Sequence, residues 1–477
     1  MKLKPLFALM LAPLLVSSAA AQTNSTPIFQ FAIFYNSLLE FVWCAPMTVT
    51  GLTYANSDIY IGSICPLTFN SLVTTTGRIV VTNWFGYTTN QYTNTVTFNA
   101  GYCTNIAALA LPIAMTNLHE IINLPPAGED PNSLMGQQRY YDKAEIVLLV
   151  TNVSSSIATV TVTLKTNASD PGTNITATYY PTNRISTNYV QITTNFPFLT
   201  LTNTFTDQRE GATVLVTDIR MDLLNKWLIT NAVANGKFPN TAGLYNASTV
   251  PNILYVADNR TTNSGQLTAV RLKNGTTIPT NMVNIAGNNQ RSGFTVATPS
   301  PLYVWGNYNC PVPGDLNTRI TTNNAYPASL VSDALTILSP TWVDSASNQA
   351  LGKSGGGIRT ATSTTVNAAI ITGVVYSTGS GSNQYSGGVM NLPRLLEDWG
   401  NGGSTKLTLN TSIVNLFNSV RATHQWQQPG NYYYAPTRQF SFDVNYLNYT
   451  MQPPGTPMLG EVLRGSWATV KPGTTGS

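Results

Sequence analysis

The side chains that most often carry catalysis are scarce in this chain. Only two histidines, His119 and His424, occur among its 477 residues, which argues against a Ser-His-Asp triad and against a metal site built from several histidines. The run HEIIN at His119 matches the zinc motif H-E-x-x-H at two positions only, because Asn123 replaces the second histidine. We interpret His119 as an exposed residue of a helix. His424 lies two residues before Trp426, and we interpret it as a packing or binding residue.

Carboxylates are the remaining catalytic candidates. Glycoside hydrolysis needs two carboxyl groups about 5–10 Å apart, and lyases combine a base with calcium or an arginine. The candidates are Asp333, Asp344, Glu397 and Asp398, with Arg394 close in sequence. No calcium-loop motif occurs, and neither glycine-rich run (352–357 and 377–388) fits a phosphate-binding pattern. We therefore predict no catalytic, metal-binding or cofactor-binding residue. A carbohydrate-active enzyme is the alternative if two carboxylates, or a carboxylate and Arg394, converge in a cleft.

Aromatic side chains suggest binding more than catalysis. Seven aromatic residues lie among Asn, Gln and Thr in GNYYYAPTRQFSFDVNYLNY (430–449), and rings with hydroxyl tips suit carbohydrate or protein surfaces. The predicted ligand-binding residues are Trp399, Trp426, Tyr432, Tyr433 and Tyr434. The alternative is that the rings of residues 430–449 cap an open end of the fold.

The four cysteines are Cys44, Cys65, Cys103 and Cys310, and no C-x-x-C pair suggests zinc. An even count in an exported protein permits disulfides. We predict one disulfide within the first three cysteines, either Cys44–Cys65 or Cys65–Cys103, with free buried thiols as the alternative.

The first 21 residues have the pattern of a secretory signal peptide. Lys2 and Lys4 precede an apolar run, Leu6 to Val16, and small residues end at Ala21. The run is shorter than the roughly 20 residues that span a bilayer. We predict an exported protein, extracellular or at the cell surface, with the periplasm as a further possibility and no integral membrane segment. Removal of the two lysines lowers the net charge from +4 to about +2, and no basic block predicts nucleic acid as a partner.

The composition predicts a mainly β protein. Only 9% of residues are charged while 43% are hydrophobic, against about 25% charged in ordinary soluble proteins. Thr, Asn, Ser and Gly take the place of charges, which suits strands whose outer faces are hydroxyl and amide rows.

Short strands follow one another closely in residues 22–104, the first predicted block. Four of them are Met47–Thr50, Asp58–Ile61, Leu67–Phe69 and Arg78–Val81, with turn-forming residues between and no Asn-Gly hairpin turn. This pattern favours a β-helix-like body, a parallel β solenoid whose coils stack. A β-sandwich is the alternative fold.

The remaining blocks differ from the first in the elements that their sequences predict. Residues 105–250 are predicted to be an inserted α+β domain, with helices in 112–124 and 216–231 (Asp218 as N-cap) and strands in 144–152 and 159–164. Residues 251–418 return to short strands in a β-helix-like body, with one hairpin turn at Asn274-Gly275. Residues 419–477 are predicted to be a C-terminal cap and tail.

Several segments together resemble a known family. FAIFYNSLLEF, MTVTGLTYANSDIYIG, SPLYVWGNYN, ASLVSDALTILSPTW, TTVNAAIITGVV, GGVMNLPRLLEDW and LNTSIVNLFNS resemble, in this order, segments of uncharacterised large exported bacterial proteins. Some of those proteins are related to PilX-type pilus-associated proteins. The resemblance implies a surface or pilus-linked, β-helix-like body without a known active site. A plain secretory signal replaces the prepilin leader, which argues against assembly into a pilus shaft.

These observations predict a secreted or cell-surface structural or adhesive protein that is not an enzyme. The expected partners are glycans or components of the cell surface and matrix, with self-association as a further possibility. The alternative is a polysaccharide lyase or glycoside hydrolase on a β-helix.

Overall fold

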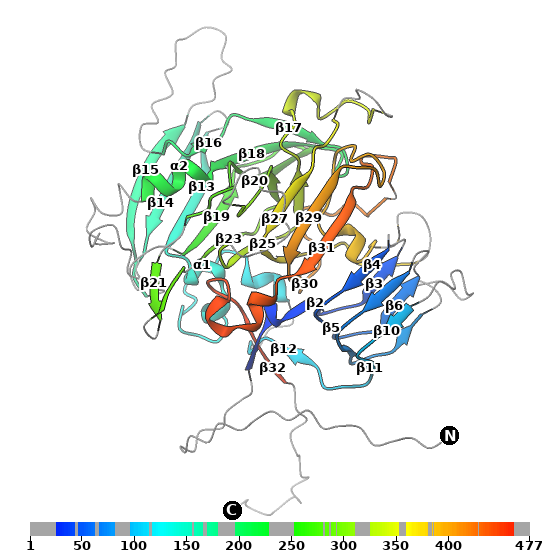
Figure 1. Ribbon diagram of the computed structural model, residues 1–477. Coiled ribbons are helices and arrows are strands. Elements are labelled where there is room, and N and C mark those ends of the chain that lie inside the picture. Colours follow the sequence, from blue (N-terminus) through cyan, green and yellow to red (C-terminus); the bar gives the residue numbers. More distant parts are fainter. Residues whose placement is uncertain are drawn as a thin grey trace, which may run out of the picture.

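The computed structural model describes residues 25–461 except 43–45, 63–65, 82–95, 114–116, 155–156, 166–168, 180–195, 229–251, 280–281, 286–287, 292, 311–324, 353–358, 380–383, 385 and 428. The described part is mainly β, with many parallel sheets of short strands and few helices (Figure 1), which confirms the predicted class. None of its helices is both long and apolar enough to cross a membrane.

The first block forms three parallel sheets that receive their strands in rotation. The first sheet contains β2 (Phe31–Tyr35), β5 (Leu52–Ala55), β8 (Val73–Thr75) and β11 (Tyr102–Cys103). The second contains β3 (Leu39–Val42), β6 (Ile59–Gly62) and β9 (Ile79–Val80). The third contains β4 (Met47–Val49), β7 (Leu67–Phe69) and β10 (Val96–Phe98). Leu39 pairs with Ile59 and Ile59 with Ile79, so the chain returns to this sheet every 20 residues. The step from β7 to β10 is longer, because Leu67 pairs with Val96. In β7 the outer residues, Leu67 and Phe69, are buried and Thr68 is not, as alternation along a strand requires.

The first of these sheets continues into the later part of the chain. β2 pairs in parallel with β30 (Ile413–Asn415), with Ile33 opposite Ile413. Beyond β30 follow β28 (Ala369–Thr372), β25 (Ala328–Ser332), β23 (Phe294–Thr298), β19 (Ile253–Asn259), β13 (Ile146–Ser154), and the antiparallel β14 (Ile157–Leu164) and β15 (Thr173–Tyr179). This twelve-stranded sheet therefore joins the strands of residues 146–442, which we call the later block, to β2 of the first block, which we call the early block.

Two more sheets complete the later block. One contains β16 (Leu199–Thr200), β18 (Ala212–Arg220), β20 (Gln266–Lys273), β24 (Leu302–Trp305) and β26 (Leu335–Leu338), with β17 (Thr204–Asp207) paired to β18; the other contains β27 (Thr364–Asn367), β29 (Lys406–Thr411) and β31 (Thr437–Phe442). The steps between paired strands are unequal here, since Phe294 pairs with Ala328 and Ile370 with Ile413. Aliphatic side chains from all three sheets of the block, among them Leu330, Ile337 and Val366, form one core.

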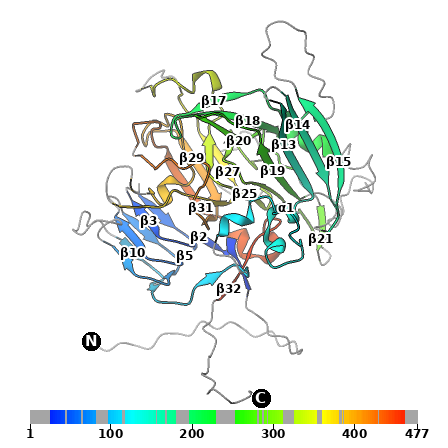
Figure 2. The same cartoon turned by 180° about the vertical axis from the view of Figure 1, so that it is seen from behind.

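A connecting segment and the two ends of the described chain meet outside these sheets. β1 (Ser25–Pro27) and β12 (Leu109–Ala110) pair antiparallel with the two edges of β32 (Met458–Glu461). The segment after β12 carries η2 (Leu118–Ile121), η3 (Gly136–Gln138) and α1 (Tyr140–Lys143), and Figure 2 shows α1 beside β19 at the back of the molecule. The remaining elements are η1 (Ile28–Gln30), α2 (Met221–Trp227), the hairpin β21 (Met282–Ile285) and β22 (Asn288–Arg291), η5 (Asp344–Ala346), η6 (Val389–Asn391), η7 (Val444–Leu447) and η8 (Tyr449–Met451).

Three local expectations are wrong. Asn274-Gly275 is not a hairpin turn, because β20 has β18 and β24 on its two edges and the chain turns a corner there instead. Asp218 is not an N-cap, because β18 continues to Arg220 and the helix α2 begins at Met221. The predicted helix over 112–124 is reduced to η2, which Asn117 caps by accepting the backbone N–H of His119.

Candidate functional site

The turn between β17 and β18 brings charged side chains into the interior. Asp207 accepts hydrogen bonds from the backbone N–H groups of Arg209 and Glu210 at 2.8 and 3.0 Å and from the Tyr303 hydroxyl at 2.6 Å. All three charged residues are buried. The Asp207 carboxylate thus holds the turn in one conformation, in which the side chains of Arg209 and Glu210 contact the segment 390–424.

Arg394 is the meeting point of this turn with the later block. Its guanidinium donates to Glu210 at 2.9 Å, to the Ser419 hydroxyl at 3.1 Å and to the carbonyl of Ala422 at 3.0 Å. A carboxylate and Arg394 therefore converge, as the enzyme alternative requires. They do so as a buried ion pair whose two side chains are 3% and 5% exposed.

Arg209 and His424 extend the cluster. The Arg209 guanidinium donates to the side-chain oxygen of Asn391 and to the carbonyl of His424. The second oxygen of Glu210 accepts the backbone N–H of His424 at 3.1 Å and lies 3.3 Å from its ring Nδ1. The His424 side chain is 62% exposed, so the cluster reaches solvent at this residue.

Burial shifts the pKa values of two groups in the cluster, Asp207 and Arg209. Burial, together with the charge of Glu210, raises the pKa of Asp207 above its ordinary value. Burial and the neighbouring Arg394 lower the pKa of Arg209 to about 10. The two carboxylates and two guanidiniums balance one another, as buried charges must.

Three of the predicted ligand-binding aromatics line this cluster. Trp426 donates its indole N–H to the Tyr433 hydroxyl at 3.2 Å, and the Tyr432 hydroxyl accepts the backbone N–H of Gln427 at 2.8 Å. All three rings are buried. The hollow that they line with Arg209 and Arg394 has no room for a water molecule. The cluster is thus a closed polar core and not an open cleft.

The other two predicted ligand-binding residues lie apart from this hollow. Trp399 is fully buried and presents no ring face to a ligand in this structure. Its backbone N–H donates to the carbonyl of Tyr434 at 3.2 Å. Tyr434 is half-buried and is the one predicted aromatic with a partly open side chain.

Asp333 lies at the corner between β25 and β26 and pairs with His119. The His119 Nε2 is 3.0 Å from the carboxylate, which also accepts backbone N–H groups from Val420 and Ala422 at 2.6 and 2.9 Å. Burial raises the pKa of Asp333, but the hydrogen bonds from His119 and from these amides outweigh it and hold the pKa below its ordinary value. The expectation that His119 is an exposed residue of a helix is wrong, because η2 packs it inward, 1% exposed, against Phe417.

The remaining carboxylates are dispersed. Asp344 pairs with Arg271 at 2.6 Å, and Asp398 accepts the backbone N–H of Gly400 at 2.9 Å. Glu397 accepts the N–H and hydroxyl of Ser339 at 2.6 and 2.7 Å, and burial raises its pKa to about 7. No three His, Cys, Asp or Glu side chains in the described ranges come close enough to hold a metal ion.

The disulfide prediction falls mostly outside the described residues. Cys44 and Cys65 are not among them, while Cys103 carries a free thiol. Because Cys103 is a free thiol, Cys44–Cys65 is the favoured one of the two predicted pairings, and it stays a prediction.

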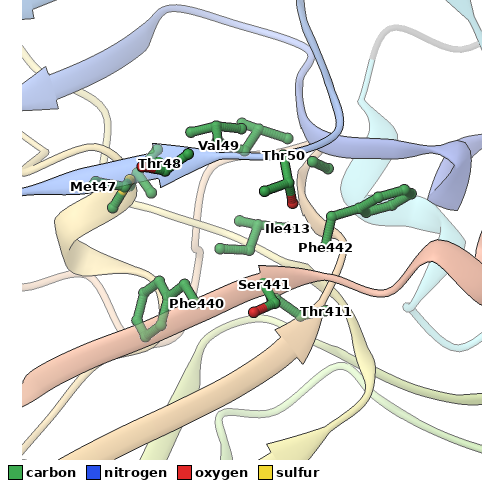
Figure 3. Close-up of a pocket in the computed structure, with 12 residues that line it drawn as sticks. Met47, Thr48, Val49, Thr50, Thr411, Ile413, Phe440, Ser441 and Phe442 are labelled. Atoms are coloured by element: carbon green, nitrogen blue, oxygen red, sulfur yellow. The ribbon is translucent and has the colours of Figure 1, made fainter. Parts of the chain in front are cut away.

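A second candidate site is a groove between two sheets. It separates β4, the edge of one sheet of the early block, from β31, the edge of a sheet of the later block. Figure 3 shows the two strands on opposite sides with Ile413 between them. The groove holds a cavity of about 40 Å³ whose twelve lining residues include no charged side chain.

The sequence reasoning missed the turn at 207–210 and the groove. Three charges in four residues, DQRE, stand out in a chain with 9% charged residues, and that concentration was the available signal. The groove has no local signal, because its two strands are about 390 residues apart.

Comparisons with protein-family models, with curated proteins and with solved structures found no match to this chain. The family resemblance described above therefore stays a prediction.

Proposed function

We propose that this protein is an exported structural or adhesive scaffold whose parallel ladders wind as a β-helix-like body. The repeated step of 20 residues among the early strands of the first block supports the winding, because each sheet receives one strand per turn of chain. The last turn of this block is longer, since Leu67 pairs with Val96. The unequal steps of the later block fit coils with loops of different lengths. The signal-like first 21 residues support export.

The main support for a non-enzymatic role is that the charged side chains of Asp207, Arg209, Glu210 and Arg394 are buried and bonded to one another or to backbone groups. Arg394, Glu210 and Asp207 bond to one another, to backbone groups and to Tyr303. Among the described residues, the hollow beside them has no room for a water molecule. Such a cluster docks the 207–211 turn onto the segment 390–424. A surface role, with glycan or matrix components as ligands, then depends on polar and aromatic side chains that are at least partly exposed, such as Tyr434.

A glycan array and a cell-wall pull-down with the chain from Gln22 test this role. We expect saturable binding to at least one glycan or wall fraction, weakened by Tyr434→Ala and unchanged by Tyr449→Ala. Tyr449 is exposed, whereas Tyr434 is half-buried. Absence of binding to all fractions would exclude the binder and leave the scaffold.

The raised pKa of the buried Asp207 favours one other candidate, a carbohydrate-active enzyme. A general acid needs a carboxyl whose pKa is raised, as burial and the charge of Glu210 raise that of Asp207. Incubation with acidic and neutral polysaccharides, followed by assays for new reducing ends and unsaturated uronates, tests this candidate. Cleavage that is lost in Asp207→Asn would replace the scaffold proposal.

A further inference from the structure

Exposed apolar side chains gather on one short segment that follows β31. The described residues include eight large hydrophobic side chains that are exposed, and three of them lie within six residues: Val444, Leu447 and Tyr449, each more than half exposed. They belong to η7 and η8, which are red in Figure 1. Single apolar residues are ordinary on a protein surface, whereas a group of them marks an interaction site.

The backbone of η7 points two of these side chains the same way. Residues three apart in a 3₁₀ helix lie one above the other, and Val444 and Leu447 are three apart. Tyr446 between them is turned inward, where its ring packs on Phe29 with 6.1 Å between centroids and its hydroxyl donates to the carbonyl of Ala328 at 3.3 Å. The segment is therefore fixed by its inner side, and its apolar outer side faces solvent.

Two polar caps hold this segment in one conformation. The Asp443 carboxylate accepts the backbone N–H of Asn445 at 3.0 Å at the start of η7, and the Asn448 side chain accepts that of Thr450 at 3.1 Å at the start of η8. A surface that is already ordered loses less conformational freedom when a partner covers it. The three apolar side chains therefore form a preorganised patch.

The elements that form the patch present no exposed charge. The described segment from Gln439 to Gly460 contains one charged residue, Asp443, which is buried. η1, which packs on η7, contains none. The patch is thus apolar at its centre and polar but uncharged around it.

The nearest charged residues along the chain lie outside the patch. Arg438 is half-buried on β31 and is six residues before Val444, which is about 20 Å of extended chain. Lys143 is half-buried and donates to the carbonyl of Gly455 at 3.3 Å. Glu461 is exposed at the end of β32, twelve residues after Tyr449, where it pairs with β12.

We propose that a second copy of this chain covers the patch, in a two-fold dimer in which Val444, Leu447 and Tyr449 of one protomer face the same surface of its partner. Two-fold dimers place one surface on both sides of the contact. A charged surface would repel its own copy, whereas an uncharged apolar surface gains from leaving water. The inference deepens the proposed scaffold role, on which it rests, by naming the chain itself as a partner.

The size of the patch predicts a weak dimer. Stable interfaces bury about 800 Å² on each partner, with roughly 20–30 residues a side, and this patch is smaller. We therefore expect a reversible equilibrium between monomer and dimer at micromolar to millimolar protein. Weak contacts of this kind add up when many copies are held on one surface, which is the setting of an adhesive scaffold.

Sedimentation velocity of the chain from Gln22 measures the association. We expect the sedimentation coefficient to rise with concentration toward that of a dimer. Leu447→Asp brings like charges together across the contact and is expected to weaken the dimer at least tenfold. Leu134→Asp is the matched control, because Leu134 is also more than half exposed but lies in the connecting segment. It is expected to dimerise as the wild type does.

Mixing two charge variants gives a positive test. Leu447→Lys alone is expected to weaken the dimer as Leu447→Asp does. An equal mixture of the two is expected to recover at least tenfold in affinity over either alone, since opposite charges then face each other. Circular dichroism first shows that each variant is folded.

Three results would overturn the proposal: a monomer up to millimolar protein, a dimer that Leu447→Asp leaves intact, or equal weakening by Leu134→Asp. Flotation of a monomeric chain with phosphatidylcholine vesicles, lost in Leu447→Asp, would identify a lipid surface as the occupant instead. The glycan array decides separately. Glycan binding without a dimer would keep the adhesive role and remove this inference, and a dimer without glycan binding would leave the scaffold.

Discussion

At the scale of single residues, many of the charged side chains that the structure describes are buried. The composition suggested polar faces of hydroxyls and amides in place of ion pairs, yet Asp218, Arg271, Asp333, Arg394 and Glu397 are all buried. Each is hydrogen-bonded or paired, since an unpaired buried charge costs several kcal/mol. Charge serves here to fix corners and turns of the backbone.

Asp333→Asn tests one such corner. We expect a loss of about 3 kcal/mol in the free energy of unfolding at pH 7, because the charge-assisted bonds from His119 and from the amides of Val420 and Ala422 weaken. Urea unfolding measures it. The folded-state pKa of Asp333 is lowered, so its contribution is present above the ordinary value of 3.8 and is lost as the pH falls below it. The exposed Asp130→Asn is the control, and equal effects of the two substitutions would contradict the account.

Glu397→Gln tests a carboxyl with the opposite shift. Its pKa is raised from 4.5 to about 7 by burial, so its contribution to stability is complete below pH 4.5 and is lost as the pH rises toward 7. Glutamine keeps an acceptor for the Ser339 N–H and carries no proton to lose. We expect the variant to gain about 3 kcal/mol relative to the wild type between pH 4.5 and 8, measured by unfolding at each pH. Parallel pH curves for the two proteins would show that Glu397 is not buried as described.

At the scale of elements, corners and turns connect segments that are distant in sequence. Gly51, between β4 and β5, has no space for a side chain, since a Cβ would lie 2.6 Å from the Phe442 ring and 2.8 Å from the Ala32 Cβ. At this corner the ring of Phe442, the last residue of β31, packs against Gly51 of the early block.

Gly51→Ala should destabilise the protein by about 1–3 kcal/mol, because the ring of Phe442 must move. Thermal unfolding followed by circular dichroism gives the size of the effect. Gly460→Ala is the matched control, since a Cβ there meets nothing within 4 Å. A neutral Gly51→Ala would mean that β31 does not end at this corner.

The turn 207–211 should behave as a clamp on the segment 390–424. A double-mutant cycle of Glu210→Ala and Arg394→Ala is expected to give a coupling energy of about 1–3 kcal/mol. The same cycle on Arg220 and Asp222, an ion pair at the surface with side chains 46% and 35% exposed, should give less than about 1 kcal/mol. Equal couplings would argue that the 207–211 turn is solvated.

The strands were largely predictable from the sequence, and their partners were not. β7 matches its predicted bounds, β4 and β9 lie inside theirs, and β6 is shifted by one residue to Ile59–Gly62. β5 and β8 were missed, because their residues were assigned to the turns between strands. The helix over 216–231 was placed too early, because Val216 and Ile219 lie three residues apart, as on one face of a helix. In the structure both faces of β18 are buried there, and its pairing with β20 makes this segment a strand.

The same limit applies to the candidate site. Arg394 and Trp426 were recognised by residue type. Their partner Glu210 lies 184 residues before Arg394, and no local pattern indicates a contact over that distance. Residue types predict which side chains can take part in a site, whereas the long-range strand order decides which of them meet.

At the scale of the whole molecule, the described ends of the chain lie side by side within one stack of strands. β30 near one end and β2 near the other are neighbours in the twelve-stranded sheet, and β1 and β32 pair beside them. The early block therefore extends the later block as further layers. The interruption between β4 and β31 leaves the groove on one face of this joint.

A crystal structure of the chain from Gln22 tests this arrangement most directly. The account predicts that β2 and β30 are parallel neighbours about 4.8 Å apart, with Ile33 opposite Ile413, and that the ladder from β3 to β9 advances by 20 residues. Two separate bodies joined by a linker, or an antiparallel pairing of β2 with another strand, would contradict it.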